Sequence, residues 1–245
     1  METRQVRPVR GTAERRFYLG MSLAILAAVL LGFAPSFFLR PWFPDRPVPP
    51  ERFFLLHGAV FTAWFVLLVV QAALVSARRT ALHRRLGVYG GVLALAMVVL
   101  GTVGALIAAR RPTGFVGIEI PPLQFLVIPL GDMLLFALLV GLALAWRRDL
   151  QSHKRLMLVA SIAIITAAIA RWPFAIMSAG PPAFFGFTDL FLVPIAAWDL
   201  FTRRRLHPVT LWGGLLLIAS QPLRLWFSGT AAWMGFAHWA VGLLG

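Results

Sequence analysis

The chain has 245 residues, of which 60% are hydrophobic and only 13% are charged, and it contains no cysteine. A soluble domain is about 45–50% apolar and about 25% charged, so this composition excludes an ordinary soluble protein and predicts a polytopic membrane protein. The missing cysteines exclude disulfides, thiolate metal sites and cysteine nucleophiles.

The net charge of +14 comes from 22 arginines and Lys154, set against 9 acidic residues. The basic residues lie in short clusters at the ends of apolar segments instead of covering one folded face. We therefore expect Arg-rich loops that contact anionic lipid head groups of the bilayer, and no nucleic-acid binding.

The apolar runs predict an all-α membrane helix bundle. Residues 1–16 form a basic cytoplasmic segment, residues 17–227 the transmembrane bundle, and residues 228–245 an apolar C-terminal segment. Residues 230–244 are too short to span easily and are rich in tryptophan, so we expect an interfacial helix there. Seven spanning helices are expected at 17–36, 51–76, 86–109, 122–146, 155–172, 183–201 and 209–227.

The distribution of basic residues predicts the orientation. Residues 1–16 and the loops 76–86, 147–155 and 202–208 hold sixteen of the 23 basic residues, and the rest of the chain holds seven. By the positive-inside rule the N-terminus is cytoplasmic and the C-terminus lies outside.

An internal repeat is predicted from the three outer loops, each of which begins near an Arg and a Pro and ends on a Pro pair. Proline cannot continue a helix but suits its first turn, so each loop ends one helix and starts the next. We infer three helical hairpins in parallel orientation and a seventh helix after them, the alternative being chance proline pairs in loops. The loops run from Arg40–Pro41 to Pro49–Pro50, from Arg111–Pro112 to Pro121–Pro122, and from Arg171–Trp172–Pro173 to Pro181–Pro182.

Three ionisable residues are expected within the membrane. His57, Asp132 and Asp189 lie seven to ten residues after the proline pairs, in the outer half or at the centre of the bilayer. A carboxylate there is costly unless it is paired, protonated or hydrated. The three residues form a functional cluster facing the bundle interior, or the two aspartates neutralise Arg171 and Arg224, or both hold at once.

Depth along the helices suggests which aspartate is paired. Arg224 lies ~22 Å from the cytoplasmic face, closer in depth to Asp189 than to Asp132. We therefore expect Asp189 to be the ion-pair carboxylate and Asp132 to hold a proton around neutral pH.

The second predicted helix carries a polar stripe, because His57, Trp64 and Gln71 are seven residues apart and lie close to one face. The stripe either lines a ligand site or forms hydrogen bonds between helices, with an interfacial Trp.

Histidines supply the candidate metal ligands. His83, His153 and His207 each begin a helix at the cytoplasmic surface, and imidazole nitrogen suits zinc, copper or haem iron. Neighbouring Arg and Lys side chains disfavour a cation, and such histidines also serve as interfacial anchors. His57 with His238 is a second two-ligand possibility at the outer side, so haem or a transition metal stays open as a cofactor.

Other enzymatic signatures are missing. The chain has no HExxH, no Walker loop and no GxSxG motif. A retinal Schiff base is excluded because Lys154 lies at the cytoplasmic surface.

Three segments resemble uncharacterised bacterial multi-pass membrane proteins in which His-Arg-x-x-Gly or His-Lys-Arg-Leu-Met motifs open transmembrane helices. They are LHGAVFTAWFVLLVVQ (56–71), LHRRLG (82–87) and SHKRLM (152–157). The resemblance covers about the middle half of the chain and implies a bacterial inner membrane. It implies no activity and no catalytic residue.

Three classes of function follow. The first is a small-molecule or ion binding or transport protein built on the His57, Asp132 and Asp189 cluster. The second is a haem- or metal-binding redox component, and the third is a non-catalytic assembly or scaffold protein. Closed ion pairs within the cluster would favour the third.

Overall fold

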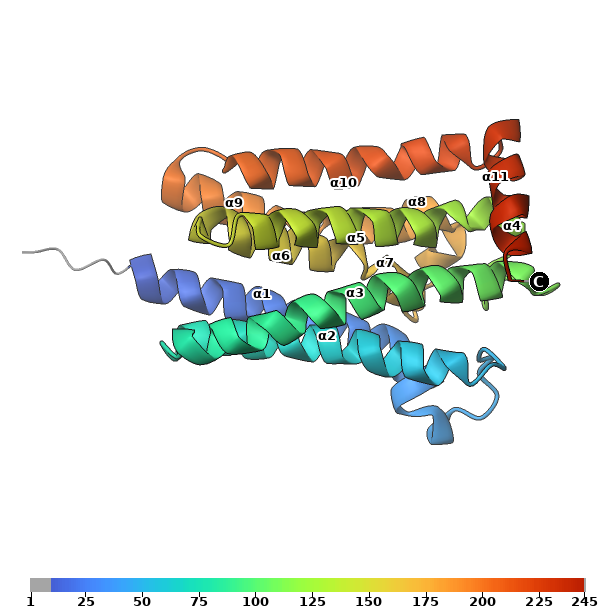
Figure 1. Ribbon diagram of the computed structural model, residues 1–245, viewed down its shortest axis with the longest axis horizontal. Coiled ribbons are helices and arrows are strands. Elements are labelled where there is room, and N and C mark those ends of the chain that lie inside the picture. Colours follow the sequence, from blue (N-terminus) through green and yellow to red (C-terminus); the bar gives the residue numbers. More distant parts are fainter. Residues whose placement is uncertain (1–9, 245) are drawn as a thin grey trace, which may run out of the picture.

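The computed structural model describes residues 10–244, and every regular element in that range is a helix. The long helices lie side by side along the long axis of the molecule, and α11 crosses one end (Figure 1). The helices are α1 (Arg10–Phe33), α2 (Phe53–Ser76), α3 (Thr80–Arg110), α4 (Pro122–Phe125), α5 (Val127–Ala145), α6 (Leu150–Ala163), α7 (Thr166–Ile169), α8 (Pro181–Asp189), α9 (Leu192–Arg203), α10 (Pro208–Phe227) and α11 (Ala231–Gly242), with the short turns η1 (Ala34–Phe38), η2 (Arg40–Trp42) and η3 (Ala175–Ala179).

Six helical stretches of the described chain are long and apolar enough to cross a membrane, and each overlaps one predicted helix. This confirms an all-α structure whose helices have the length and composition of membrane spans. The seventh predicted helix corresponds to α10, which has 20 residues but falls outside the six. Its last turns contain Gln221, Pro222 and Arg224, which lower its hydropathy. The six are Gly11–Phe38, Phe53–Ser76, Thr80–Arg110, Pro122–Ala145, Leu150–Ile169 and Pro181–Arg203.

Several predicted helix starts are wrong, because helices at the basic end of the bundle begin before the apolar run. α1 begins at Arg10, α3 at Thr80 and α6 at Leu150, five to seven residues earlier than expected. Arginine is a good helix former, so these polar segments continue the helix beyond the apolar residues. The first nine residues of the predicted basic segment 1–16 lie outside the described residues.

Three predicted helices are interrupted. Pro129 and Gly131 mark the first as a helix that is kinked or broken, whereas the other two are expected to be continuous. α4 and α5 are separated at Leu126, α6 and α7 at residues 164–165, and α8 and α9 at residues 190–191. Pro129 and Pro194 have no N–H to donate to the carbonyl four residues earlier, which accounts for the first and third breaks. Pro122 and Pro181 each occupy the first turn of a helix, as predicted, whereas α2 begins three residues after its proline pair.

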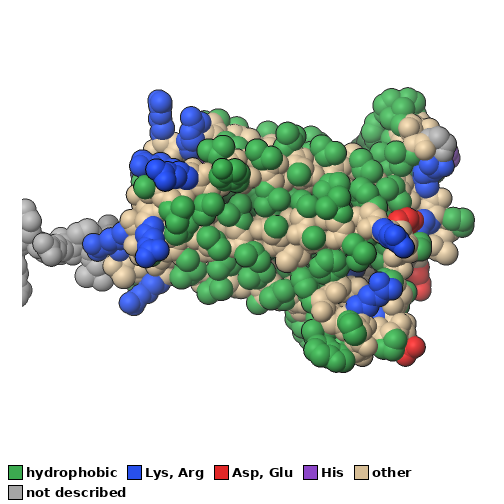
Figure 2. Space-filling view, turned by 60° about the horizontal axis from the view of Figure 1, so that its bottom comes forward, with side chains coloured by type: hydrophobic (Ala, Val, Ile, Leu, Met, Phe, Trp, Pro, Cys, Tyr) green, Lys and Arg blue, Asp and Glu red, His purple; other side chains and the backbone are tan. Residues whose placement is uncertain are grey.

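The centre of the bundle is α6, which packs against α5 and α10. Its residues Val159, Ala160 and Ile162 are wholly buried. The flank of the molecule is mostly apolar, with Lys and Arg side chains gathered toward its ends (Figure 2). Exposed side chains such as Val88 and Phe201, 70% and 78% accessible, are costly in water and suited to lipid.

Two hydrogen bonds hold the C-terminal helix across the end of the bundle. Trp233 Nε1 donates to the carbonyl of Leu123 in α4 at 2.8 Å, and Arg110 Nη1 of α3 donates to the carbonyl of Leu244 at 2.8 Å. α11 is therefore fixed crosswise to the long helices, the orientation of a helix that lies along a surface (Figure 1).

Candidate functional site

An outer polar cluster, which we define as Asp132, Asp189, Gln221 and Arg224, joins three helices. Asp132 comes from α5, Gln221 and Arg224 from α10, and Asp189 is the last residue of α8. Arg224 Nη1 lies 2.6 Å from Asp132 Oδ1, and the two side chains are only 9% and 8% exposed. They form a buried ion pair between α10 and α5.

The guanidinium of Arg224 is satisfied on its other sides as well. It donates to the carbonyl of Ile128 at 2.9 Å, to the carbonyl of Ser220 at 3.2 Å and to Ser220 Oγ at 3.3 Å. It also lies 5.2 Å from the ring centre of Phe185. A buried charge needs such additional hydrogen bonds to offset its desolvation.

Gly131 leaves the space that this arginine occupies. A Cβ added at Gly131 would lie 2.3 Å from Arg224 Cδ, closer than real contacts allow. The glycine beside Asp132 thus lets the α10 side chain reach the carboxylate.

The expectation that Arg224 pairs with Asp189 is wrong. Asp189 instead accepts a hydrogen bond from Gln221 Nε2 at 2.8 Å and is half-buried. The physical reason is lateral packing: α10 packs directly on α5, so the carboxylate beside Arg224 is Asp132 even though depth alone favours Asp189.

Asp189 lies where two interrupted helices meet. Its neighbour Thr188 lies at the end of α8, 3.2 Å from Thr166 Oγ1, which begins α7 after the break in α6. Among the described residues no salt bridge involves Asp189. Discontinuous membrane helices commonly surround ion and substrate sites in transporters.

Arg171 does not act as a counter-charge to either aspartate. Its side chain is exposed, donates to the carbonyl of Ala167 at 2.5 Å and lies 5.0 Å from the ring centre of Phe33. No carboxylate of the described chain is in salt-bridge contact with it.

The polar stripe of α2 reaches separate neighbours instead of one cavity. His57 stacks on Phe61 at 4.1 Å, with its Nδ1 at 3.4 Å from the carbonyl of Leu100. Trp64 is buried and donates from Nε1 to Ser161 Oγ at 3.2 Å. Gln71 lies at the other end of α2, and the structure gives neither it nor His57 a contact with the outer polar cluster.

A second buried ion pair, which the sequence reasoning missed, lies near the opposite end. Arg155 of α6, the largest fully buried side chain described, pairs through Nη2 and Nε with Asp199 of α9. Arg155 Nη1 also donates to Gln151 Oε1 at 2.7 Å. Asp199 Oδ2 accepts from the His207 N–H at 3.0 Å and from Thr210 Oγ1. We call these five residues the inner polar cluster.

The inner polar cluster continues into α1. Lys154 Nζ lies 2.5 Å from Glu14 Oε1 and 4.7 Å from the ring centre of Tyr18. The sequence feature that indicates this ion pair is Asp199, an acidic residue inside the predicted helix 183–201 and four residues before an arginine cluster.

His207 is separate from the other two histidines of the basic end. It caps α10, and its Nδ1 accepts the N–H of Val209 at 3.2 Å. Burial, followed by the charges of Arg155 and Arg203, lowers the pKa of His207. His83 and His153 do come together, with ring centres 6.5 Å apart.

The metal hypotheses that required three converging ligands fail on geometry. Within residues 10–244 no group of three or more His, Cys, Asp or Glu side chains is placed to hold a metal ion. His238 is exposed on α11 and hydrogen-bonds through Nδ1 to the carbonyl of Met234, so the structure does not bring it to His57.

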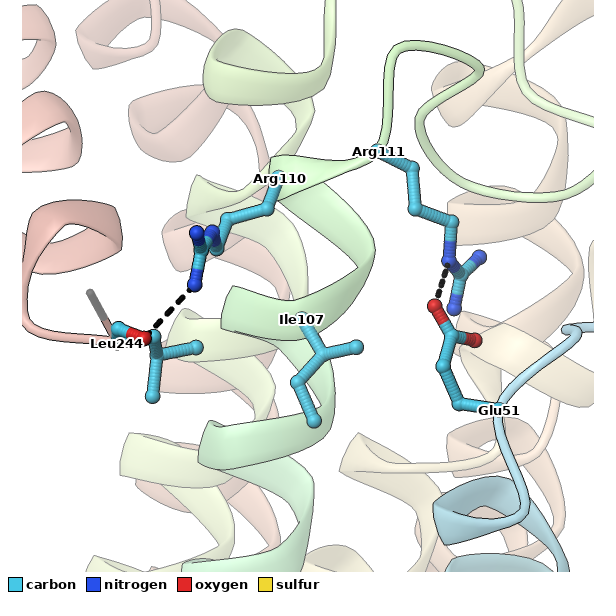
Figure 3. A pocket seen from close by; sticks show the side chains of 5 residues that line it. All are labelled: Glu51, Ile107, Arg110, Arg111 and Leu244. Atoms are coloured by element: carbon cyan, nitrogen blue, oxygen red, sulfur yellow. Dashed lines mark hydrogen bonds and ion pairs between the residues drawn. The ribbon is translucent and has the colours of Figure 1, made fainter.

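A small hollow of about 240 Å³ lies at the end of the bundle beside the C-terminal segment, between Glu51, Ile107, Arg110, Arg111 and Leu244 (Figure 3). Arg111 Nε donates to Glu51 Oε1 at 2.8 Å. Desolvation favours the neutral acid, but the hydrogen bond and charge of Arg111 outweigh it and lower the pKa of Glu51. The pair ties the start of α2 to the end of α3.

No protein-family model, curated protein or solved structure matches the chain.

Proposed function

We propose that the chain is a seven-helix protein of a bacterial inner membrane, with a cytoplasmic N-terminus and an external C-terminus. α10 is the seventh span, because its 20 residues extend ~30 Å, the thickness of the hydrocarbon core. α11 then lies on the outer surface, which its crosswise orientation supports. Fusing a reporter that is active only in the periplasm to the last residue should give signal, and a cytoplasmic C-terminus would contradict this topology.

Within that bundle, the proposed activity is proton- or cation-responsive binding or transport, with Asp189 as the exchanging group. One observation carries this proposal: a half-buried carboxylate at a helix break is hydrogen-bonded by a neutral amide and has no cationic partner in the described chain. Such a group is costly in a membrane unless it takes up a proton, water or a cation.

The residues around Asp189 have different roles in this proposal. Arg224 and Asp132 neutralise one another and fix α10 against α5. Gln221 lies one turn before Arg224 on α10, so its hydrogen bond joins the exchanging carboxylate to that helix. Loss or gain of charge at Asp189 changes the hydrogen bond to Gln221 and is thereby passed to α10.

The test is flux through proteoliposomes that contain the purified full chain and enclose a pH-sensitive dye or, in a parallel set, a sodium-sensitive dye. A potassium diffusion potential is applied with valinomycin, in the presence and absence of sodium. We expect wild-type vesicles to take up protons or sodium and Asp189→Asn to lose the uptake. Asp45→Asn, which removes an exposed loop carboxylate, should behave as wild type.

Uptake no faster than in empty liposomes, or full uptake by Asp189→Asn, would overturn the proposal. The two closed ion pairs would then favour a non-catalytic assembly protein, since they hold helices together without exposing charge.

A further inference from the structure

Two histidines of the basic end contact each other edge-on, outside both polar clusters. His83 lies in the first turn of α3 and His153 in the first turn of α6, helices that are far apart in the sequence. Their ring centres are 6.5 Å apart. This pairing does not depend on the function proposed for Asp189, which lies in a different part of the bundle.

Both imidazoles have a nitrogen available as a ligand. His153 Nδ1 donates to the carbonyl of Ala143 at 2.8 Å, so its Nε2 carries the lone pair. Backbone carbonyls orient metal-binding histidines in this way. His83 Nδ1 is buried and has no hydrogen-bond partner.

A third unpartnered polar atom comes from α2. Gln71 Oε1 is buried without a hydrogen-bond partner. A Cβ added at Gly87, one turn beyond His83, would lie 3.9 Å from Gln71 Nε2. The Gln71 amide is therefore beside the histidine face of α3, and unsatisfied buried polar atoms are costly unless something binds them.

The separation of the rings fits a single ion. The ring planes lie at 86°, in an edge-on arrangement, and the ring centres are 6.5 Å apart. A ring nitrogen lies about 1.1 Å from its ring centre, so an ion midway between the centres would lie about 2.1 Å from each nitrogen once side-chain rotation turns a nitrogen of each ring toward it. Bonds from histidine to zinc are about 2.0–2.1 Å long.

Two of the four basic residues that follow these histidines in the sequence are paired with carboxylates. Lys154 pairs with Glu14, and Arg155 pairs with Asp199. The arginines that follow His83, at positions 84 and 85, are exposed to the surroundings. The basic sequence context therefore opposes a bound cation less than the residue types suggest.

We propose that His83 and His153 bind one transition-metal ion between α3 and α6, with the Gln71 side-chain oxygen as a third ligand. Two imidazole nitrogens and an amide oxygen form a donor set for copper or zinc, and the general affinity order places Cu²⁺ above Zn²⁺. The site would tie α2, α3 and α6 together at the basic end.

The experiment titrates Cu²⁺ and Zn²⁺ into the full chain, purified through a tag that contains no histidine. We expect one ion per chain by elemental analysis and calorimetry. Loss of a second-shell partner costs about 10–100-fold in metal affinity, so His83→Gln and His153→Gln should each weaken binding at least about 100-fold. His238→Gln, which removes an exposed histidine elsewhere, should bind as wild type.

A spectroscopic measurement on the wild-type chain removes the dependence on variant folding. Electron paramagnetic resonance of the Cu²⁺-loaded protein should show two imidazole nitrogen ligands. Absence of stoichiometric binding, binding that survives in both histidine variants, or a Soret band of bound haem that these variants abolish would overturn the single-ion site.

Discussion

The buried pair of Arg224 and Asp132 predicts a large and specific coupling energy. Asp132→Asn leaves the guanidinium without its counter-charge, and removing one partner of a buried pair costs about 3–5 kcal/mol. The carbonyl of Ile128 and the groups of Ser220 still accept from Arg224, so we expect the lower end, about 3 kcal/mol. The double variant, which adds Arg224→Gln, leaves no charge unpaired. Its loss in free energy of unfolding should therefore be smaller than the sum of the losses in the two single variants by roughly 2 kcal/mol.

The assay is reversible unfolding by SDS in mixed micelles, followed by far-ultraviolet circular dichroism, for both single variants and the double variant. A matched cycle combines Asp189→Asn with Arg224→Gln and should give coupling below roughly 0.5 kcal/mol. A coupling energy below roughly 0.5 kcal/mol between Asp132 and Arg224 would refute their pairing, and so would a coupling energy above that size between Asp189 and Arg224.

Four further changes test the rest of the bundle by the same unfolding assay. Arg155→Gln leaves the Asp199 carboxylate buried without its cation and should lower the free energy of unfolding by about 3–5 kcal/mol. Asp149→Ala removes the N-cap of α6 and should cost about 1 kcal/mol, whereas Asp149→Asn should retain most of the stability. Because folding lowers the pKa of His207, the unfolded state binds more protons. The contribution of His207 to the free energy of unfolding is therefore present above its ordinary pKa of ~6.5 and is lost as the pH falls through its lowered pKa in the folded state. His207→Asn should abolish this pH-dependent loss. Gly131→Ala should displace the guanidinium side chain and destabilise the protein, unlike Gly141→Ala, where an added Cβ meets nothing within 4 Å.

The sequence was sufficient to predict the six long apolar helices and their order, because in a membrane each long apolar run can satisfy its backbone hydrogen bonds only as a helix. It was less informative about boundaries. The arginines at the start of α1 and the polar start of α3 look like loops by hydropathy, yet they belong to the helices. Pro129, followed by Gly131, does indicate a kink or break in its helix, whereas the breaks at residues 164–165 and 190–191 are not predicted from the sequence.

The ion pairs show why the candidate site could be predicted only in part. Counting residues from helix ends gives depth, which is one coordinate, while pairing depends on which helices are lateral neighbours. Arg224 reaches Asp132 because α10 packs on α5 and Gly131 leaves room, and neither fact is visible in residue spacing. The pairing of Arg155 with Asp199 depends in the same way on the contact between α6 and α9.

Infrared difference spectroscopy between about pH 5 and pH 9 separates Asp189 from Asp132 as the exchanging carboxyl group. We predict a pH-dependent protonated-carboxyl band that disappears in Asp189→Asn and persists in Asp132→Asn, because Asp132 is held by Arg224 and Asp189 only by Gln221. A band that persists in Asp189→Asn, or that disappears only in Asp132→Asn, would contradict the proposed site.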